Sequence, residues 1–68
     1  MYYVIFRLRN RIPIATLTET KGMLSLNDIK RMYPDATMAR NFDNGKTALN
    51  YMIQEGYVKQ NGKDYTMW

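Results

Sequence analysis

The sequence predicts a single α+β domain, and three observations support this. Residues 2–9 (YYVIFRLR) are rich in aromatic and β-branched side chains, as is typical of a strand. Residues 46–55 repeat apolar side chains at the i, i+3, i+4 spacing of an amphipathic helix. Asn61-Gly62 separates two short strand-like runs, which is a strong local signal for a tight hairpin. A chain of 68 residues has room for one small core.

The strand predicted at residues 2–9 has two different faces. Alternation places Tyr2, Val4, Phe6 and Leu8 on one face and Tyr3, Ile5, Arg7 and Arg9 on the other. The second face becomes polar only from Arg7 onward, so we expect the start of the strand to be covered on both sides. Arg7, Arg9 and Arg11 alternate along the strand and its exit, and are interpreted as solubilising charges or as a basic patch.

Residues 12–21 fit two structures. Pro13 at a first helical position, Ile14 and Leu17 at helical spacing, and Gly22 as a stop favour a helix. The many β-branched side chains instead favour a strand that forms a hairpin with residues 2–9. The helix is the preferred interpretation, and the strand stays open as the alternative.

A helix is expected to begin at Ser25, whose hydroxyl and the Asp28 carboxylate can satisfy free amide groups in a capping box. Pro34 ends this helix, because the residue before a proline avoids helical geometry. Residues 35–42 are predicted to add a short helical turn. Asp43-Asn44-Gly45 then marks a turn and supplies an N-cap.

The helix at residues 46–55 is the most regular in the chain. Its expected buried stripe comprises Leu49, Met52 and Ile53. Gly56 follows the helix end, where a positive φ is needed, and the predicted hairpin follows Gly56 at once. The sharp reversal should pack the hairpin beside the helix and turn the opposite helix face to solvent.

In this arrangement the segment KTALNYMIQEGYVKQNGKDYTM resembles the winged helix-turn-helix family. Leu49, Met52, Gly56 and Val58 occupy the family's pattern of recognition-helix end and wing. The resemblance implies a small winged helix-turn-helix of two to three helices with a C-terminal wing and an extra N-terminal strand. Either residues 12–22 and 25–33 supply the preceding helices, or residues 25–33 and 36–42 do, with residues 2–18 forming a hairpin.

The resemblance also implies binding of double-stranded DNA by a small transcriptional regulator or a mobile-element protein, for example from a phage. The outward face of the recognition helix would carry Lys46, Thr47, Asn50, Tyr51 and Gln54. Asn and Gln side chains can pair with adenine in the major groove. Lys59, Gln60, Asn61 and Lys63 would form the wing, and Arg40 would reach a phosphate. The net charge of +4 agrees with a polyanionic partner.

A protein-interaction module is the alternative function. The aromatic side chains look too numerous for so small a core, so we expect some to be exposed or covered by a partner. They are Tyr2, Tyr3, Phe6, Tyr51, Tyr57, Tyr65 and Trp68. The strand at residues 2–6 is a plausible edge for a homodimer, which would offset the small size of the core.

Composition argues against several classes of protein. Cysteine and histidine are both absent, which removes disulfides, thiolate chemistry and histidine-ligated metals. The carboxylates are scattered and no nucleophile has a neighbouring base, so we expect no enzyme, cofactor, metal or small-molecule substrate. No apolar run approaches the ~20 residues that a membrane helix needs. A cytoplasmic protein without membrane contact is therefore expected.

Overall fold

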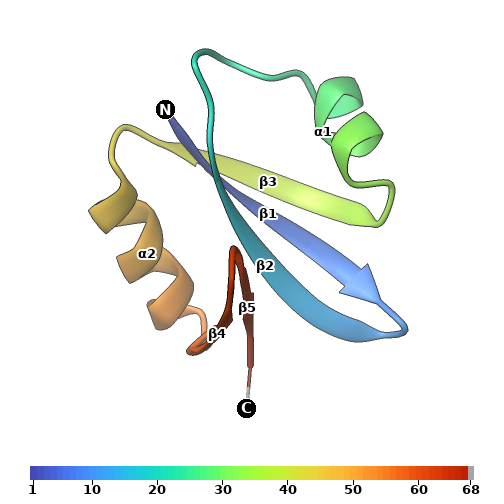
Figure 1. Cartoon of the computed structure of the whole chain (residues 1–68), viewed down its shortest axis with the longest axis vertical. Helices are drawn as coiled ribbons and strands as arrows, with labels where there is room; N and C mark the ends of the chain where they lie inside the picture. The colour runs from blue at the N-terminus through green and yellow to red at the C-terminus, as the bar shows by residue number, and fades with distance from the viewer. Residues whose placement is uncertain (68) are drawn as a thin grey trace.

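Five strands and two helices make up the computed structural model, which describes residues 1–67 (Figure 1). The elements are β1 Tyr2–Arg9, β2 Ile12–Glu19, α1 Leu26–Met32, β3 Ala36–Phe42, α2 Gly45–Gln54, β4 Lys59–Asn61 and β5 Asp64–Thr66. All strands pair antiparallel in one sheet with the order β3-β1-β2-β5-β4. The α+β class is therefore as predicted, but the winged-helix arrangement is wrong.

The two helices lie on opposite faces of this sheet, and β3 separates them along the chain (Figure 1). Successive side chains of β1 point to opposite faces. Val4 packs in the cluster under α2, whereas Tyr3 and Ile5 pack in the cluster under α1 with Ile29. No helix pair within residues 1–67 is joined by a short turn, so this part of the chain contains no helix-turn-helix. Neither of the two helices is long and apolar enough to cross a bilayer.

Residues 12–19 form a strand, so the preferred helix prediction for this segment is wrong. β2 pairs with β1 along its full length, from Tyr2 opposite Glu19 to Arg9 opposite Ile12. The turn between them is Asn10-Arg11, whose φ angles of 51° and 67° are typical of a type I′ hairpin turn. Ile14, Thr16 and Thr18 are buried in the paired strand, and this outweighs the helical spacing of Ile14 and Leu17.

Residues 36–42 also form a strand rather than the predicted helical turn. β3 pairs with the other side of β1, from Tyr2 opposite Phe42 to Arg7 opposite Ala36, with a register shift after Phe6. Because β1 has partners on both sides, its backbone is not available as a dimer edge. The prediction of a homodimer through the N-terminal strand is therefore wrong.

The helix at residues 45–54 and the hairpin after it are close to their predicted positions. Ala48 and Met52 are fully buried, but Ile53 is 50% exposed and does not belong to the buried stripe. Gly56 has a φ of +97°, as its position past the helix end requires. Asn61 pairs with Asp64, so the hairpin loop is Gly62-Lys63, one residue later than predicted.

The aromatic side chains are accommodated inside this small fold. Tyr3, Tyr57 and Tyr65 are buried, and Tyr2, Phe6 and Tyr51 pack partly buried against the cluster under α2. The sheet makes this possible because it supplies two apolar faces instead of one. Trp68 lies outside the described residues. An excess of exposed aromatic side chains is therefore not found among the other six.

Candidate interaction site

The predicted recognition helix presents most of its polar residues to solvent. The Asn44 side chain caps α2 by accepting a hydrogen bond from the Thr47 amide at 2.8 Å. Lys46, Thr47, Asn50 and Gln54 lie on the outer side of the helix, away from its buried residues. Tyr51 is different, because its ring packs against Phe6 and Phe42 with centroids 6.1 and 5.2 Å away. It belongs to the core and not to an outer binding face.

The residues assigned to the wing do not continue the outer face of α2. The side chains of Lys59 and Asn61 lie on the side of the sheet that α1 partly covers. Their register partners are Thr66 and Asp64, and Asp64 lies opposite Thr16, which is on that side. Gln60 lies opposite Tyr65 on the α2 side, and its side chain donates to the Gly62 carbonyl at 3.1 Å. Lys63 lies in the hairpin loop. The predicted DNA-binding residues are thus divided between the two sides of the sheet.

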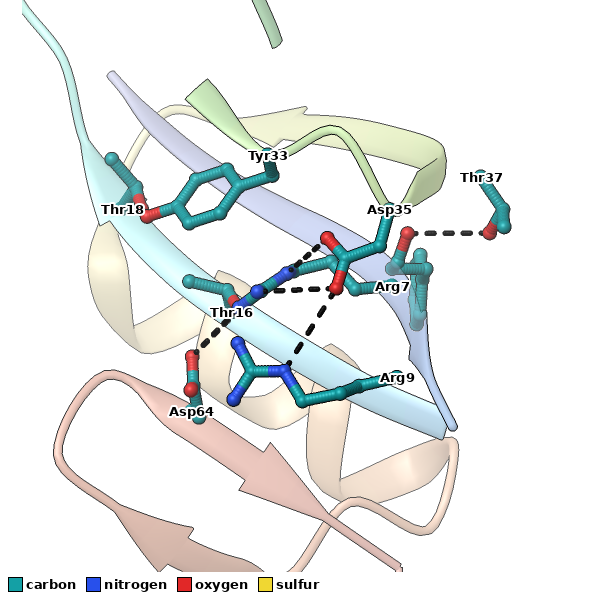
Figure 2. Close-up of polar contacts among 9 residues, drawn as sticks. Arg7, Arg9, Thr16, Thr18, Tyr33, Asp35, Thr37 and Asp64 are labelled. Carbon is teal, nitrogen blue, oxygen red and sulfur yellow. Dashed lines mark hydrogen bonds and ion pairs between the residues drawn. The ribbon is translucent and has the colours of Figure 1, made fainter. Parts of the chain in front are cut away.

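Arg7 is buried in an ionic network and is not part of an exposed basic patch (Figure 2). Its guanidinium donates to both carboxylate oxygens of Asp35, at 2.8 and 3.2 Å, and to the Thr16 hydroxyl at 3.1 Å. Thr16 in turn donates to Asp64 at 2.8 Å. The guanidinium also lies 4.6 Å from the centre of the Tyr33 ring.

The buried atoms of this network are paired, and its electrostatics follow from its geometry. The hydrogen bond from Arg7 holds the pKa of the Asp35 carboxyl below its ordinary value, and the same bond raises the pKa of Arg7. Within residues 1–67, every buried side-chain nitrogen and oxygen has a hydrogen-bond partner. This network connects β1, β2 and β5, and its buried atoms are all engaged within the fold.

A free strand edge is the most distinctive exposed feature of the fold. β3 is seven residues long and forms one edge of the sheet. The Leu8 amide donates to the Asp35 carbonyl, so even-numbered residues of β1 direct their backbone groups toward β3. Their register partners on β3 are Met38, Arg40 and Phe42. By the same alternation, Ala39 and Asn41 direct their N–H and C=O groups to the free edge.

A hollow of about 390 Å³ lies beside this edge, on the α1 side of the sheet. Apolar side chains from β1, the segment before α1, α1 itself and β3 line it, together with polar groups that include the Asn41 side chain, which lies on this side opposite Tyr3. The apolar residues are Tyr3, Met23, Leu24, Leu26, Ile29 and Ala39, and residues 40–42 complete the lining. The Leu24 amide donates to the Tyr3 hydroxyl at 2.8 Å, which fixes the segment over the sheet.

Two lining residues are unusually open to solvent. Met23 is 71% exposed and Leu26 is 54% exposed, although each borders the hollow. Exposed apolar side chains that gather beside a hollow are typical of a contact surface. The free edge and the hollow are adjacent, since residues 39–42 contribute to both. They are described together below as the β3 edge site.

Sequence reasoning misses the β3 edge site. A helical turn is predicted at residues 35–42, so no strand edge can be inferred there. A weak signal does exist, because Met23 and Leu24 are apolar residues between a glycine and a helix N-cap, where a polar loop is the norm.

The fold and the β3 edge site define a small α+β domain with a seven-residue edge strand beside a hollow and helices on both faces of its sheet. No protein-family model, curated protein or solved structure matches this chain. Within residues 1–67 no group of three or more acidic side chains is placed to hold a metal ion.

Proposed function

We propose that this domain binds another polypeptide by adding a strand to β3. The observation that carries this proposal is the adjacency of a seven-residue free edge and a hollow lined in part by exposed apolar side chains. In recognition by strand addition, backbone hydrogen bonds supply affinity and pockets for alternate side chains supply specificity. The β3 edge site offers both kinds of contact.

The two edges of the sheet differ in a way that supports this proposal. Proteins usually protect free edges with short strands, charges or bulges, because an open edge invites pairing with another chain. β4 has only three residues, all exposed, and carries Lys59. β3 also carries one charged residue, Arg40, but it is more than twice as long, and its register shift lies near its start, opposite Phe6 and Arg7. The open part, residues 38–42, is the part beside the hollow.

Selection from a random library of linear dodecapeptides against the purified domain tests the proposal. Enriched peptides should bind in solution, measured by fluorescence anisotropy. They should slow amide hydrogen exchange at Ala39 and Asn41, since these N–H groups face the free edge. Asn41→Pro removes one such N–H group without touching the core and should weaken binding about tenfold, the effect of one well-placed hydrogen bond.

A matched control exists on the opposite edge. The backbone N–H group of Gln60 points away from β5, as that of Asn41 points away from β1. Gln60→Pro therefore makes the same change at the other edge of the sheet and should leave peptide binding unchanged. A proton–nitrogen NMR spectrum of each variant establishes that it is folded. Enrichment of peptides that perturb α2 and leave β3 unchanged would contradict strand addition.

Double-stranded DNA binding through α2 is a second candidate function. It is supported by the placement of Lys46, Thr47, Asn50 and Gln54 on one helix face and by the net charge of +4. Anisotropy of a labelled random duplex, at about 50 and 200 mM salt, tests it, because phosphate contacts weaken as salt rises. A salt-sensitive complex that Asn50→Ala or Gln54→Ala weakens would support this function. No binding at the lower salt concentration would exclude it.

A further inference from the structure

We infer that the strand received by β3 is acidic, with apolar residues alternating with Asp or Glu; this inference rests on the strand-addition function proposed above. An added strand continues the pleat of the sheet, so its side chains alternate between the two faces. One set meets the environment on the α1 side of β3, and the other set meets the environment on the α2 side. The two environments differ in chemistry.

The α1 side of the edge combines apolar side chains with the uncharged polar side chain of Asn41, which lies opposite Tyr3. Ala39 points to this side, as its place in the cluster with Tyr3 and Ile29 indicates. Met23 and Leu26 border the hollow beyond it. Every second residue of an added strand would therefore enter the hollow, and a volume of about 390 Å³ accommodates apolar side chains of ordinary size. A carboxylate on this side would find no cationic side chain among the lining residues, since the Arg40 side chain is on the α2 side.

The α2 side of the edge is cationic. Arg40 lies opposite Val4, which packs under α2, so the Arg40 side chain is on that face. Its guanidinium lies 5.4 Å from the centre of the Tyr51 ring, an arrangement that holds the charge over the face of the sheet. Arg40 is exposed, and within residues 1–67 it pairs with no carboxylate. A carboxylate on the neighbouring strand would complete this site.

A second copy of the chain fits the edge less well. In a two-fold antiparallel pairing, Ala39 and Asn41 must supply the outward-facing hydrogen bonds. If Ala39 pairs with Ala39 of the second copy, or Asn41 with Asn41, the two Arg40 side chains are diagonal neighbours across the interface. If Ala39 pairs with Asn41, the two Arg40 side chains lie directly opposite each other. Like charges in these positions are destabilising. Two chains of charge +4 would also repel each other at longer range.

Three synthetic heptapeptides test this inference on the whole domain. One alternates valine with glutamate, the second alternates valine with lysine, and the third has the composition of the first with its valines in one block. We expect the alternating glutamate peptide to bind about tenfold more tightly than either of the others. Added salt should reduce its advantage over the lysine peptide.

Variants assign the effect to Arg40. Arg40→Gln should reduce the preference for glutamate over lysine to about threefold or less, which is what a purely long-range attraction would leave. Lys63→Gln removes the same charge at the opposite end of the sheet and should keep most of the preference. Equal effects of the two substitutions would overturn the role of Arg40.

The remaining outcomes separate this inference from the strand-addition function. If the glutamate and lysine peptides bind equally and Asn41→Pro weakens both, strand addition stands and the acidic partner is wrong. If no peptide slows amide exchange at Ala39 and Asn41, both proposals fail. A dimer in sedimentation that Asn41→Pro disperses would show a second copy at the edge and would overturn the inference of an acidic partner.

Discussion

Arg11 holds an unfavourable backbone conformation in the turn between β1 and β2. Its φ of 67° lies in the left-handed region, where a β-carbon is crowded against the backbone. The type I′ turn needs positive φ at both central residues, and Asn10 tolerates it better than most residues. We expect Arg11→Gly to raise the free energy of unfolding by about 0.5–1 kcal/mol, measured by urea denaturation.

The charge of Arg11 has to be separated from its conformation. Arg11→Ala removes the charge and keeps the β-carbon, so it should change stability by less than about 0.5 kcal/mol. Equal stabilisation by Arg11→Gly and Arg11→Ala would mean that charge repulsion, and not the turn conformation, is the cause.

Asp35 makes the stability of the fold dependent on pH. Its pKa is lowered in the folded state by the hydrogen bond from Arg7. A lowered folded pKa stabilises the fold above the ordinary pKa of the carboxyl, and this stabilisation is lost as the pH falls through the folded value. We therefore expect the urea midpoint to decrease as the pH falls below about 4.

Substitution identifies the carboxyl that is responsible. Asp35→Asn should be less stable than the parent at neutral pH and should lose less stability on acidification. Asp28, whose pKa the cap at Ser25 also lowers, contributes in the same pH range, so some dependence should remain. Asp43→Asn lies outside the Arg7 network and serves as the control; if it flattens the profile as much as Asp35→Asn, the assignment is wrong.

Gly56 controls how α2 connects to the C-terminal hairpin. The chain reverses there with a φ of +97°, and the Tyr57 amide then donates to the Met52 carbonyl at 2.9 Å. We expect Gly56→Ala to destabilise the fold by about 1–2 kcal/mol, because alanine disfavours this conformation. Gly22 is exposed, has no positive φ, and has no atom within 4 Å of the place that a β-carbon would take.

Gly22→Ala is therefore the matched control for Gly56→Ala. It should change the free energy of unfolding by less than about 0.5 kcal/mol. Thermal or urea unfolding of both variants measures the difference. A loss of similar size for both substitutions would indicate a general cost of replacing glycine, and the junction would then have no special role.

Local signals predict some elements and fail for others. The Ser25 cap, the Asn44 cap and Gly56 act within a few residues of the chain, and α1, α2 and the hairpin lie close to where these signals place them. Residues 12–19 and 36–42 carry apolar side chains at spacings that suit a helix as well as a strand. Pairing with β1 decides between them, and that pairing is not local.

The β3 edge site depends on the order of the strands, so no short segment could reveal it. The sequence predicts Arg40 as a phosphate contact, and the structure places it on an open strand edge above Tyr51. The sequence does not suggest Asn41 as a binding residue. Its N–H and C=O groups are available to another strand only because β3 is an edge of the sheet. Likewise Arg7 resembles a surface charge until Asp35 and Asp64, distant in sequence, are brought beside it.

The position of β1 as an interior strand, with a partner on each side, indicates where the molecule should open last. β1 has β2 on one side and β3 on the other, with apolar clusters on both faces, and its residues Val4 and Ile5 have no exposed surface. β4 is paired only with β5, and its three residues are all exposed. Local openings with little buried apolar surface cost less free energy than global unfolding.

Native-state hydrogen exchange in low concentrations of urea can measure this order. The amides of Val4 and Ile5 should exchange only through global unfolding, with a free energy that falls steeply as urea is added. The Val58 amide, which donates to the Thr66 carbonyl at 3.1 Å, should exchange through a smaller opening that depends weakly on urea. Equal free energies of exchange for the Val4 and Val58 amides would mean that the sheet opens as one unit. β1 would then be no more stable against opening than β4.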